Sequence, residues 1–153
     1  NIGSKKDLAS SVASGVYYCE QAKVKRSDSD TSGSTIMTTY NKYTPDFKCS
    51  SDGNGKGVVS TSVGLLTYDE VVYAGGYYGQ SNSNYYLYNN TYFWTMSPAG
   101  FSGSHSSVWP VDTTGSINYY TVNTSNAVRP VIILNADTLA TGSGTSSDPF
   151  VIS

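Results

Sequence analysis

The sequence predicts an α+β fold, because helix signals come early in the chain and most strand signals come late. Its 153 residues suffice for one domain with its own core and make a second full domain unexpected. The chain also combines 14 tyrosines with a net charge of only −2. Disordered chains combine few aromatics with high net charge. We therefore expect residues 1–153 to form a single folded domain.

Two segments carry the spacing or capping residues of helices. Residues 4–19 place Leu8, Val12, Val16 and Cys19 at intervals of four, four and three, after a possible capping box at 4–7. A second helix is predicted over 68–74, where Thr67 is the N-cap and Glu70 stands three residues later. Gly75-Gly76 then provides the stop.

Strand signals are concentrated in the second half of the chain. One short strand is predicted at 35–40, within a Ser- and Thr-rich region, and hairpin turn chemistry occurs at 113–115. A Gly- and Ser-rich loop at 141–147 precedes the terminal strand. The remaining predicted strands are 85–88, 92–96, 107–111, 117–122, 128–135 and 150–153.

The cysteine pair bears on residues 1–57, which we expect to form a helix followed by a loop region. Cys19 and Cys49 lack the spacing of zinc or redox motifs, so a disulfide closing this loop is our first interpretation. Two buried free thiols are the alternative. A disulfide indicates a location outside the cytosol, either extracellular or on a cell surface. The polar opening of the chain lacks a signal peptide, which fits an excised mature domain.

Charge and hydropathy exclude two classes of partner. Eight of the nine Lys and Arg residues precede residue 57, and Arg129 is the only later one. A phosphate-binding surface needs several neighbouring cations, so we expect no nucleic-acid partner. We also expect no membrane insertion, because no apolar run approaches the roughly 20 residues that span a bilayer.

Catalytic and metal-binding patterns are sparse. His105 is the only histidine, and no nucleophile motif accompanies it, so it is a candidate ligand contact or plain surface residue rather than a base. The segment 52–57 resembles half of a calcium loop, but Lys56 and Val63 occupy positions that need oxygen ligands. We therefore expect no enzymatic activity, metal or cofactor.

Four short motifs carry a resemblance to a known fold family. They are Gly64-Leu65-Leu66-Thr67 with Asp69-Glu70, Ala74-Gly75-Gly76, Trp94-Thr95-Met96-Ser97-Pro98 and Val128-Arg129-Pro130-Val131. Over residues 60–153 this pattern resembles bacterial C-type lectin-like domains, including formylglycine-generating-enzyme-like domains and the variable proteins of diversity-generating retroelements. The resemblance implies a C-type lectin-like fold with two helices and a small twisted antiparallel sheet. Residues 58–153 would form its core, and the chain ends would lie close together.

The resemblance also implies a function. In the retroelement relatives, the segment before the closing strand is diversified, and residues 102–126 have the mixed Ser, His, Trp, Asp, Asn and Tyr content of such a segment. An ordinary polar hairpin is the alternative. We expect a monomeric adhesin or receptor-type module, secreted or surface-displayed, that binds a protein or glycan. An oxidase-like enzyme and a structural pilus or surface-layer subunit are the competing classes.

The predicted binding surface is the hairpin 107–122 with its flanking loops. Large aromatic side chains supply rigid contact area, and small polar ones add hydrogen bonds. Because strand residues alternate between faces, we expect one of Tyr119 and Tyr120 to be buried unless a bulge intervenes. We expect four valines (108, 111, 122 and 128) to anchor the hidden face. The predicted ligand-binding residues are Ser104, His105, Ser107, Trp109, Asp112, Asn118, Tyr119, Tyr120 and Asn123.

Two further residues receive structural roles. Trp94 belongs to the predicted 92–96 strand, and Arg129 lies within an apolar one. A buried lone cation is costly, so we expect Arg129 to pair with Asp69 or Glu70. A substrate clamp is the alternative role for Arg129.

Overall fold

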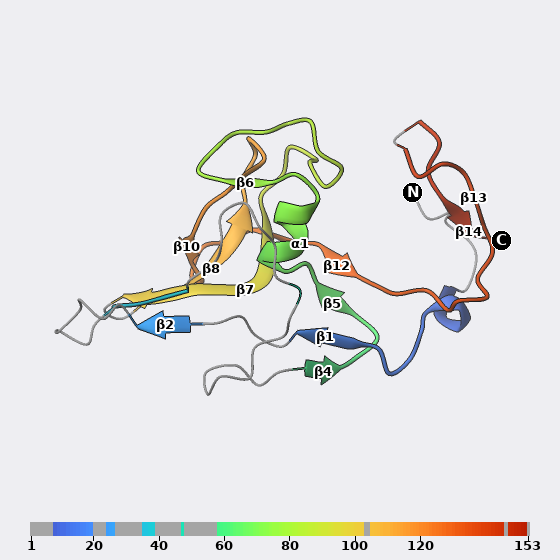
Figure 1. Cartoon of the computed structure of the whole chain (residues 1–153), viewed down its shortest axis with the longest axis horizontal. Coiled ribbons are helices and arrows are strands. Elements are labelled where there is room, and N and C mark those ends of the chain that lie inside the picture. Colours follow the sequence, from blue (N-terminus) through green and yellow to red (C-terminus); the bar gives the residue numbers. More distant parts are fainter. Residues whose placement is uncertain are drawn as a thin grey trace.

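A computed structural model describes residues 8–19, 24–26, 35–38, 47, 58–102, 105–145 and 147–152. Across these residues the protein is mostly β, with one short α-helix packed on a mixed sheet (Figure 1). The α+β class is therefore confirmed in its coarse form, with fewer helices than predicted. The predicted capping box at 4–7 and the pairing of Cys19 with Cys49 lie outside the described side chains.

The central sheet contains eight strands, six of them in the order β2-β3-β7-β8-β9-β6. β10 pairs with β8, and β11 pairs with β7. The prediction of an antiparallel sheet is wrong in part, because β6 runs parallel to β9 and β11 runs parallel to β7. β11 takes the edge of β7 that β3 leaves open, since β3 pairs only with the far end of β7. The strands are β2 (Val24–Arg26), β3 (Thr35–Thr38), β6 (Tyr77–Tyr78), β7 (Phe93–Ser102), β8 (His105–Val111), β9 (Ser116–Ile117), β10 (Tyr120–Thr121) and β11 (Ala127–Val128).

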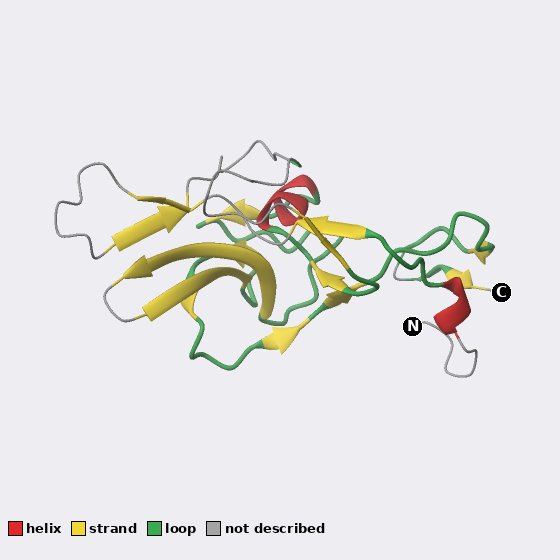
Figure 2. Cartoon of the chain, turned by 90° about the horizontal axis from the view of Figure 1, so that it is seen from below, coloured by secondary structure: helices red, strands yellow, loops and turns green. Residues whose placement is uncertain are grey.

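The long curved β7–β8 ribbon lies at the centre of the sheet (Figure 2). Register shifts between Trp94 and Pro98, and between Pro98 and Gly100, add residues to β7 relative to β8 and favour a bend. Two buried hydroxyls in this stretch have backbone partners. Thr95 donates to the carbonyl of Trp109, and the Ser97 hydroxyl accepts the Tyr68 N–H at 2.9 Å. The Trp94–Ser97 motif therefore ties β7 to both β8 and the helix.

The helix α1 (Tyr68–Tyr73) confirms the second helix prediction, including its capping box. The Thr67 hydroxyl accepts the Glu70 N–H at 3.2 Å, and Glu70 Oε2 accepts the Thr67 N–H at 2.7 Å. Since the first N–H groups of a helix lack intrahelical partners, Ser97 satisfies a third one, that of Tyr68. Sequence and tertiary contacts together fix where α1 begins.

The helix predicted over residues 4–19 is wrong within its described part. A 3-10 turn, η1 (Leu8–Ser11), is followed by β1 (Tyr17–Cys19), which pairs with β4 (Val58–Ser60). Gly15 has φ +69°, a left-handed conformation that interrupts a right-handed helix. The apolar spacing of four was therefore misleading, because Val16 and the two tyrosines after it favour a strand.

The other strand predictions have mixed outcomes. Those for 35–40, 92–96, 107–111 and 150–153 are confirmed in whole or part by β3, β7, β8 and β14 (Val151–Ile152). Residues 85–88 form turn structure, so that prediction is wrong. The segment 117–122 is broken into β9 and β10, and 128–135 contributes only β11 and β12 (Pro130–Val131). β12 pairs with β5 (Gly64–Leu65).

One hydrophobic cluster lies between α1, the 77–88 segment and the β7–β9 part of the sheet. Aromatic rings fill much of it, and Tyr68, Val71, Val111 and Ile117 are at most 1% exposed. The buried members are Leu66, Tyr68, Val71, Val72, Tyr85, Phe93, Ala99, Trp109, Val111 and Ile117.

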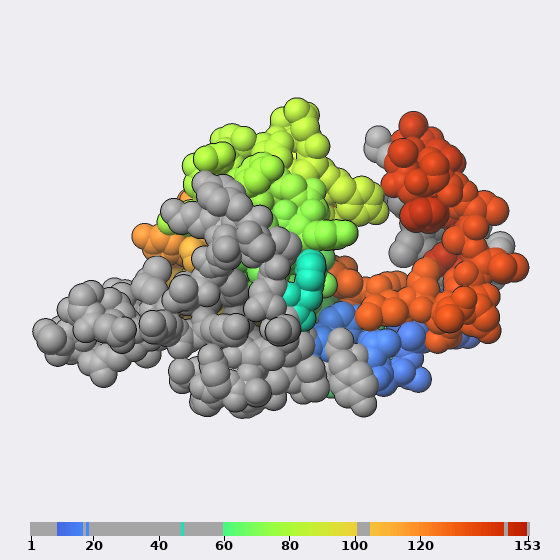
Figure 3. Space-filling view, viewed as in Figure 1, coloured from blue at the N-terminus to red at the C-terminus, as the bar shows by residue number. Residues whose placement is uncertain are grey.

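Residues near the two ends of the chain meet beside this body, as expected. Ala13 donates to the Ile133 carbonyl at 2.8 Å, and Asn135 donates to the Ser11 carbonyl at 2.9 Å. A terminal hairpin of β13 (Ala140–Thr141) and β14 follows (Figure 1). Figure 3 shows these C-terminal residues, in red, to one side of the main body.

Candidate functional site

Three tyrosines form an aromatic surface where β10 meets the start of β7. We call Tyr92, Tyr119 and Tyr120 the tyrosine patch. The rings of Tyr92 and Tyr120 meet edge to face with centroids 5.7 Å apart, and their hydroxyls are 3.2 Å apart. The hydrogen bond with Tyr120, aided by burial, raises the pKa of Tyr92 to about 12. The pair is thus fixed by both ring packing and a hydrogen bond.

The Trp109 ring packs against the Tyr119 ring and fixes its position. The two rings are nearly perpendicular, with centroids 5.9 Å apart, and Trp109 also contacts the rings of Tyr68 and Tyr78. Trp109 was predicted to be a ligand contact, and the structure buries it, leaving only 6% exposed. It is a core residue that fixes the position of a surface residue. Hydrophobic character alone did not distinguish it from Tyr119.

Both Tyr119 and Tyr120 are exposed, at 51% and 37%. The prediction that one of them is buried assumed a continuous strand over 117–122. Instead β9 ends at Ile117 and β10 starts at Tyr120, so the alternation of faces is interrupted between them. This break brings two neighbouring aromatic residues to the surface.

Asp112 and Asn118, both predicted ligand contacts, stabilise the hairpin turn instead. Asp112 is buried, and its Oδ1 accepts from the Thr114 N–H, the Thr114 hydroxyl and the Ser116 N–H. Its Oδ2 accepts from the Asn118 side-chain amide at 2.8 Å. The predicted turn at 113–115 is confirmed. Gly115 has φ +79°, and a Cβ there would lie 1.9 Å from the Asn82 carbonyl oxygen.

The remaining predicted contacts lie along β8 and after β10. Ser107, half-buried in β8, pairs with Thr121, and Val122 donates its N–H to the Ser106 carbonyl at 3.0 Å. Asn123 is exposed, and its Oδ1 accepts the Thr121 hydroxyl at 2.6 Å. His105 is exposed at the start of β8, and Ser104 lies outside the described residues. The structure thus places Asn123 close to the tyrosine patch in the chain and His105 at the distal end of β8.

Two of the four predicted anchoring valines are on the surface. Val111 is 1% exposed and Val108 is half-buried, as expected, whereas Val122 and Val128 are 56% and 65% exposed. Val122 lies just after the end of β10, whereas Val128 is exposed although it lies within β11 and pairs with Trp94. They add apolar area to the exposed segment that follows Tyr120.

Arg129 has partners other than those predicted. Its Nη1 donates to the Leu87 carbonyl, and its guanidinium carbon lies 5.2 Å from the centroid of the Phe93 ring. Glu70 instead serves the helix cap, where its Oε2 accepts the Thr67 N–H. Trp94 pairs with Val128 in β11 and is half-buried, which agrees with a structural position.

Tyr85 is a buried neighbour of Arg129 with an unusual hydroxyl. The ring is 8% exposed, and its hydroxyl has no hydrogen-bond partner within the described structure. Burial raises the pKa of Tyr85 to about 12, although the nearby Arg129 lowers it somewhat. Unsatisfied buried hydroxyls destabilise a fold, which makes Tyr85 a sensitive test position.

Sequence reasoning did not identify Tyr92 as part of the site. It immediately precedes β7, and the parallel pairing of Ala127 with Phe93 lies beside it. Its own carbonyl accepts the Ala127 N–H at 3.2 Å. No local pattern reveals contact with Tyr120, because the two residues are 28 positions apart.

Charge is nearly absent from the segments that build this surface. Asp112 is the only Asp, Glu, Lys or Arg from Tyr77 to Val128, and it is buried in the turn. The described part of the chain also shows no cluster of three or more metal-ligand side chains. None of its helices is long and apolar enough to cross a membrane. The tyrosine patch is therefore an uncharged aromatic and polar surface.

The chain is a mostly β, α+β domain with an aromatic surface beside the β7–β8 ribbon. Residues 17–136 match the model of a domain family described as a domain of unknown function (DUF6273), and the chain belongs to that family. The match includes α1, the β7–β8 ribbon and the tyrosine patch, and it ends before the β13–β14 hairpin. No curated protein and no solved structure matches the chain.

Proposed function

We propose that this domain is a ligand-binding module of the adhesin or receptor type, with the tyrosine patch as its contact surface. The observation that carries the proposal is the pair of exposed rings, Tyr119 and Tyr120, each held edge to face by a second aromatic residue. Pre-organised aromatic side chains lose little entropy on binding and are frequent hot spots.

A C-type lectin-like frame is the fold we propose for the module. Three of the motif segments that suggested it are neighbours in space, since Gly64-Leu65 pairs with Pro130-Val131 and Val128 pairs with Trp94. The contact between residues 10–13 and 133–138 also agrees with such a frame. Display on a surface or secretion remains part of the proposal and rests on the expected Cys19–Cys49 disulfide.

Genetic diversification of the site belongs to the same proposal. Of the segment 102–126, Tyr119, Tyr120, Val122 and Asn123 are exposed, whereas Trp109 and Asp112 are buried. Diversified positions are therefore expected mainly at 119–125. A reverse transcriptase gene beside a near-copy of these codons supports this part, and invariance of these positions among relatives contradicts it.

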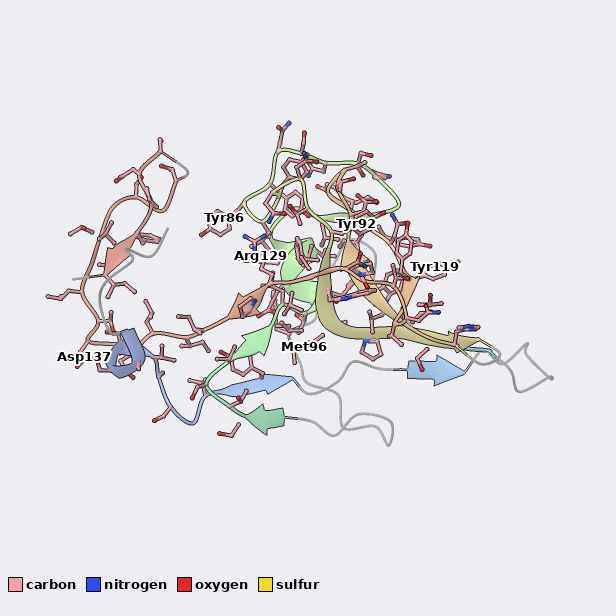
Figure 4. The ribbon with its side chains drawn as sticks, turned by 180° about the vertical axis from the view of Figure 1, so that it is seen from behind. Tyr86, Tyr92, Met96, Tyr119, Arg129 and Asp137 are labelled. Atoms are coloured by element: carbon pink, nitrogen blue, oxygen red, sulfur yellow. The ribbon has the colours of Figure 1, made fainter. Side chains whose placement is uncertain are left out.

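The test compares binding by the wild type, a Tyr119→Ala/Tyr120→Ala double variant and a Tyr86→Ala control. Tyr86 is 75% exposed and lies apart from Tyr119 and Tyr92 (Figure 4). On arrays of extracellular proteins and glycans, the double variant should lose binding by roughly 30-fold or more, about 2 kcal/mol, while the control binds as wild type. Equal binding by all three chains contradicts the proposed function.

The competing classes give different results in solution. A structural subunit self-associates in an ordered way, whereas the proposed module stays monomeric in sedimentation experiments at increasing concentration. An enzyme alternative places catalysis on His105, so turnover of any candidate substrate that disappears in His105→Ala favours that class instead.

A further inference from the structure

The tyrosine patch has features that specify the chemistry of its ligand. Its rings are exposed yet fixed, because Trp109 holds Tyr119 and Tyr92 holds Tyr120 in perpendicular contacts. Edge-to-face packing keeps a ring in place while much of it remains accessible, as the 51% exposure of Tyr119 shows. A fixed aromatic ring suits a partner with an apolar C–H face.

The hydrogen-bonding groups around the rings are neutral. The Tyr92 hydroxyl is hydrogen-bonded to that of Tyr120, and the Thr121 hydroxyl donates to the Asn123 carbonyl oxygen. When Tyr92 is the donor, the Tyr120 hydroxyl keeps its own proton for an outside acceptor, and the Asn123 amide keeps both of its protons. These groups favour a partner rich in hydroxyl groups.

Charge complementarity selects among hydroxyl-rich partners. Acidic glycans and nucleic acids require several neighbouring cations, and the segments from Tyr77 to Val128 contain no Lys or Arg. A basic protein surface would require acids, but Asp112 is already committed to the turn. Sugars without charge combine C–H faces with hydroxyl edges, which matches the patch in both respects.

We propose that the tyrosine patch binds a neutral glycan without a metal ion. A sugar ring stacks on Tyr119 or Tyr120, and its hydroxyls bond to the Tyr120 hydroxyl and the Asn123 amide. The inference rests on the proposed function and names its ligand class. Neutral protein surfaces are the competing ligand.

The experiment is native affinity electrophoresis of the full chain in gels containing neutral polysaccharides, namely starch, galactomannan, β-1,3-glucan and hydroxyethyl cellulose. Hyaluronate and heparin serve as acidic counterparts. At least one neutral polymer should retard the wild type, both with EDTA and across roughly 0.05–0.5 M NaCl, because uncharged contacts are not screened.

Three variants assign the binding to the patch. Tyr119→Ala should weaken it by about tenfold or more, and Tyr120→Phe should weaken it several-fold by removing a hydroxyl while keeping the ring. Tyr86→Ala should be retarded like the wild type. Thermal unfolding of each variant shows whether a loss reflects the site or the fold.

The inference is wrong if no neutral polymer retards the wild type, if only acidic polymers do so, or if EDTA abolishes retardation. Protein arrays run alongside the gels distinguish failure of the glycan inference from failure of the proposed function. Protein binding that depends on Tyr119 overturns the glycan inference and leaves the binding module intact. Patch variants that equal the wild type on every polymer and protein overturn both.

Discussion

The buried and the exposed residues of the β8–β10 region contrast in how they use the same kinds of side chain. Trp109 and Asp112 are buried, and Asp112 accepts four hydrogen bonds from three residues. Tyr119 and Tyr120 are exposed, although the Tyr119 ring packs on Trp109 and the Tyr120 ring packs on Tyr92. Aromatic residues in direct contact can thus differ in role, one belonging to the core and its neighbour being available for recognition.

The largest expected effect is at Trp109. Replacement by Ala removes a ring that contacts Tyr68, Tyr78 and Tyr119, and should lower the free energy of unfolding by about 3–5 kcal/mol. Urea denaturation measures this, with Trp109→Phe as the control that retains an aromatic ring and should lose less. A Trp109→Ala protein as stable as the wild type would erase the contrast between the buried and the exposed residues.

Asp112 should show the second largest effect. Asp112→Ala leaves the Thr114 and Ser116 N–H groups without their acceptor and should cost about 3 kcal/mol. Asp112→Asn is the sharper control, because its amide oxygen still accepts at the turn while Asn118 can reverse its own amide. We expect the Asn variant to recover more than half of the loss; chemical denaturation that ranks the two variants equally contradicts the turn assignment.

Tyr85→Phe should stabilise the domain by about 1 kcal/mol, because it removes a buried hydroxyl that has no described partner. The variant also has a pH signature. Because the pKa of Tyr85 is raised from 10.0 to about 12, the unfolded chain loses this proton first, so the free energy of unfolding is unaffected by this titration below pH 10 and falls as the pH rises toward 12.

Alkaline unfolding curves of the two proteins isolate this contribution, since Tyr92 titrates in both of them. Tyr85→Phe should therefore lose less stability than the wild type between pH 10 and 12. An unchanged alkaline profile, or destabilisation at neutral pH, indicates that the hydroxyl has a partner in solution.

The smallest effect on stability is expected at the two exposed tyrosines. Tyr119→Ala and Tyr120→Ala should each change the free energy of unfolding by no more than about 0.5 kcal/mol, as for other exposed positions. Differential scanning fluorimetry checks this against Tyr86→Ala. A loss near that of Trp109→Ala would show that these rings belong to the core.

Local signals in the sequence predicted part of the fold correctly. The α1 cap and the 113–115 turn depend on residues within a few positions of one another, and both were predictable. Hydrogen bonds between residues far apart in the sequence were not predictable. The Ser97 hydroxyl meets the Tyr68 N–H, and Arg129 meets the Leu87 carbonyl, in contacts that follow from tertiary packing alone.

The exposure of the residues in the candidate site was predicted only in part. The 117–122 segment has the alternation of one strand, yet Asn118 bonds to Asp112 and the strand breaks there. The break between β9 and β10 changes which residues face outward. Tyr119 and Tyr120 therefore share the surface, and Trp109, assigned outward from sequence, lies in the core.

The contact between residues near the two chain ends has a consequence for biosynthesis. Ser10 and Ser11 receive hydrogen bonds from Asn135 and Thr138, partners 125 and 127 positions later. At roughly 5–20 residues per second, a ribosome needs on the order of 6–25 s to make that intervening chain. The N-terminal segment must therefore wait without its native partner until residues 135–138 have been made.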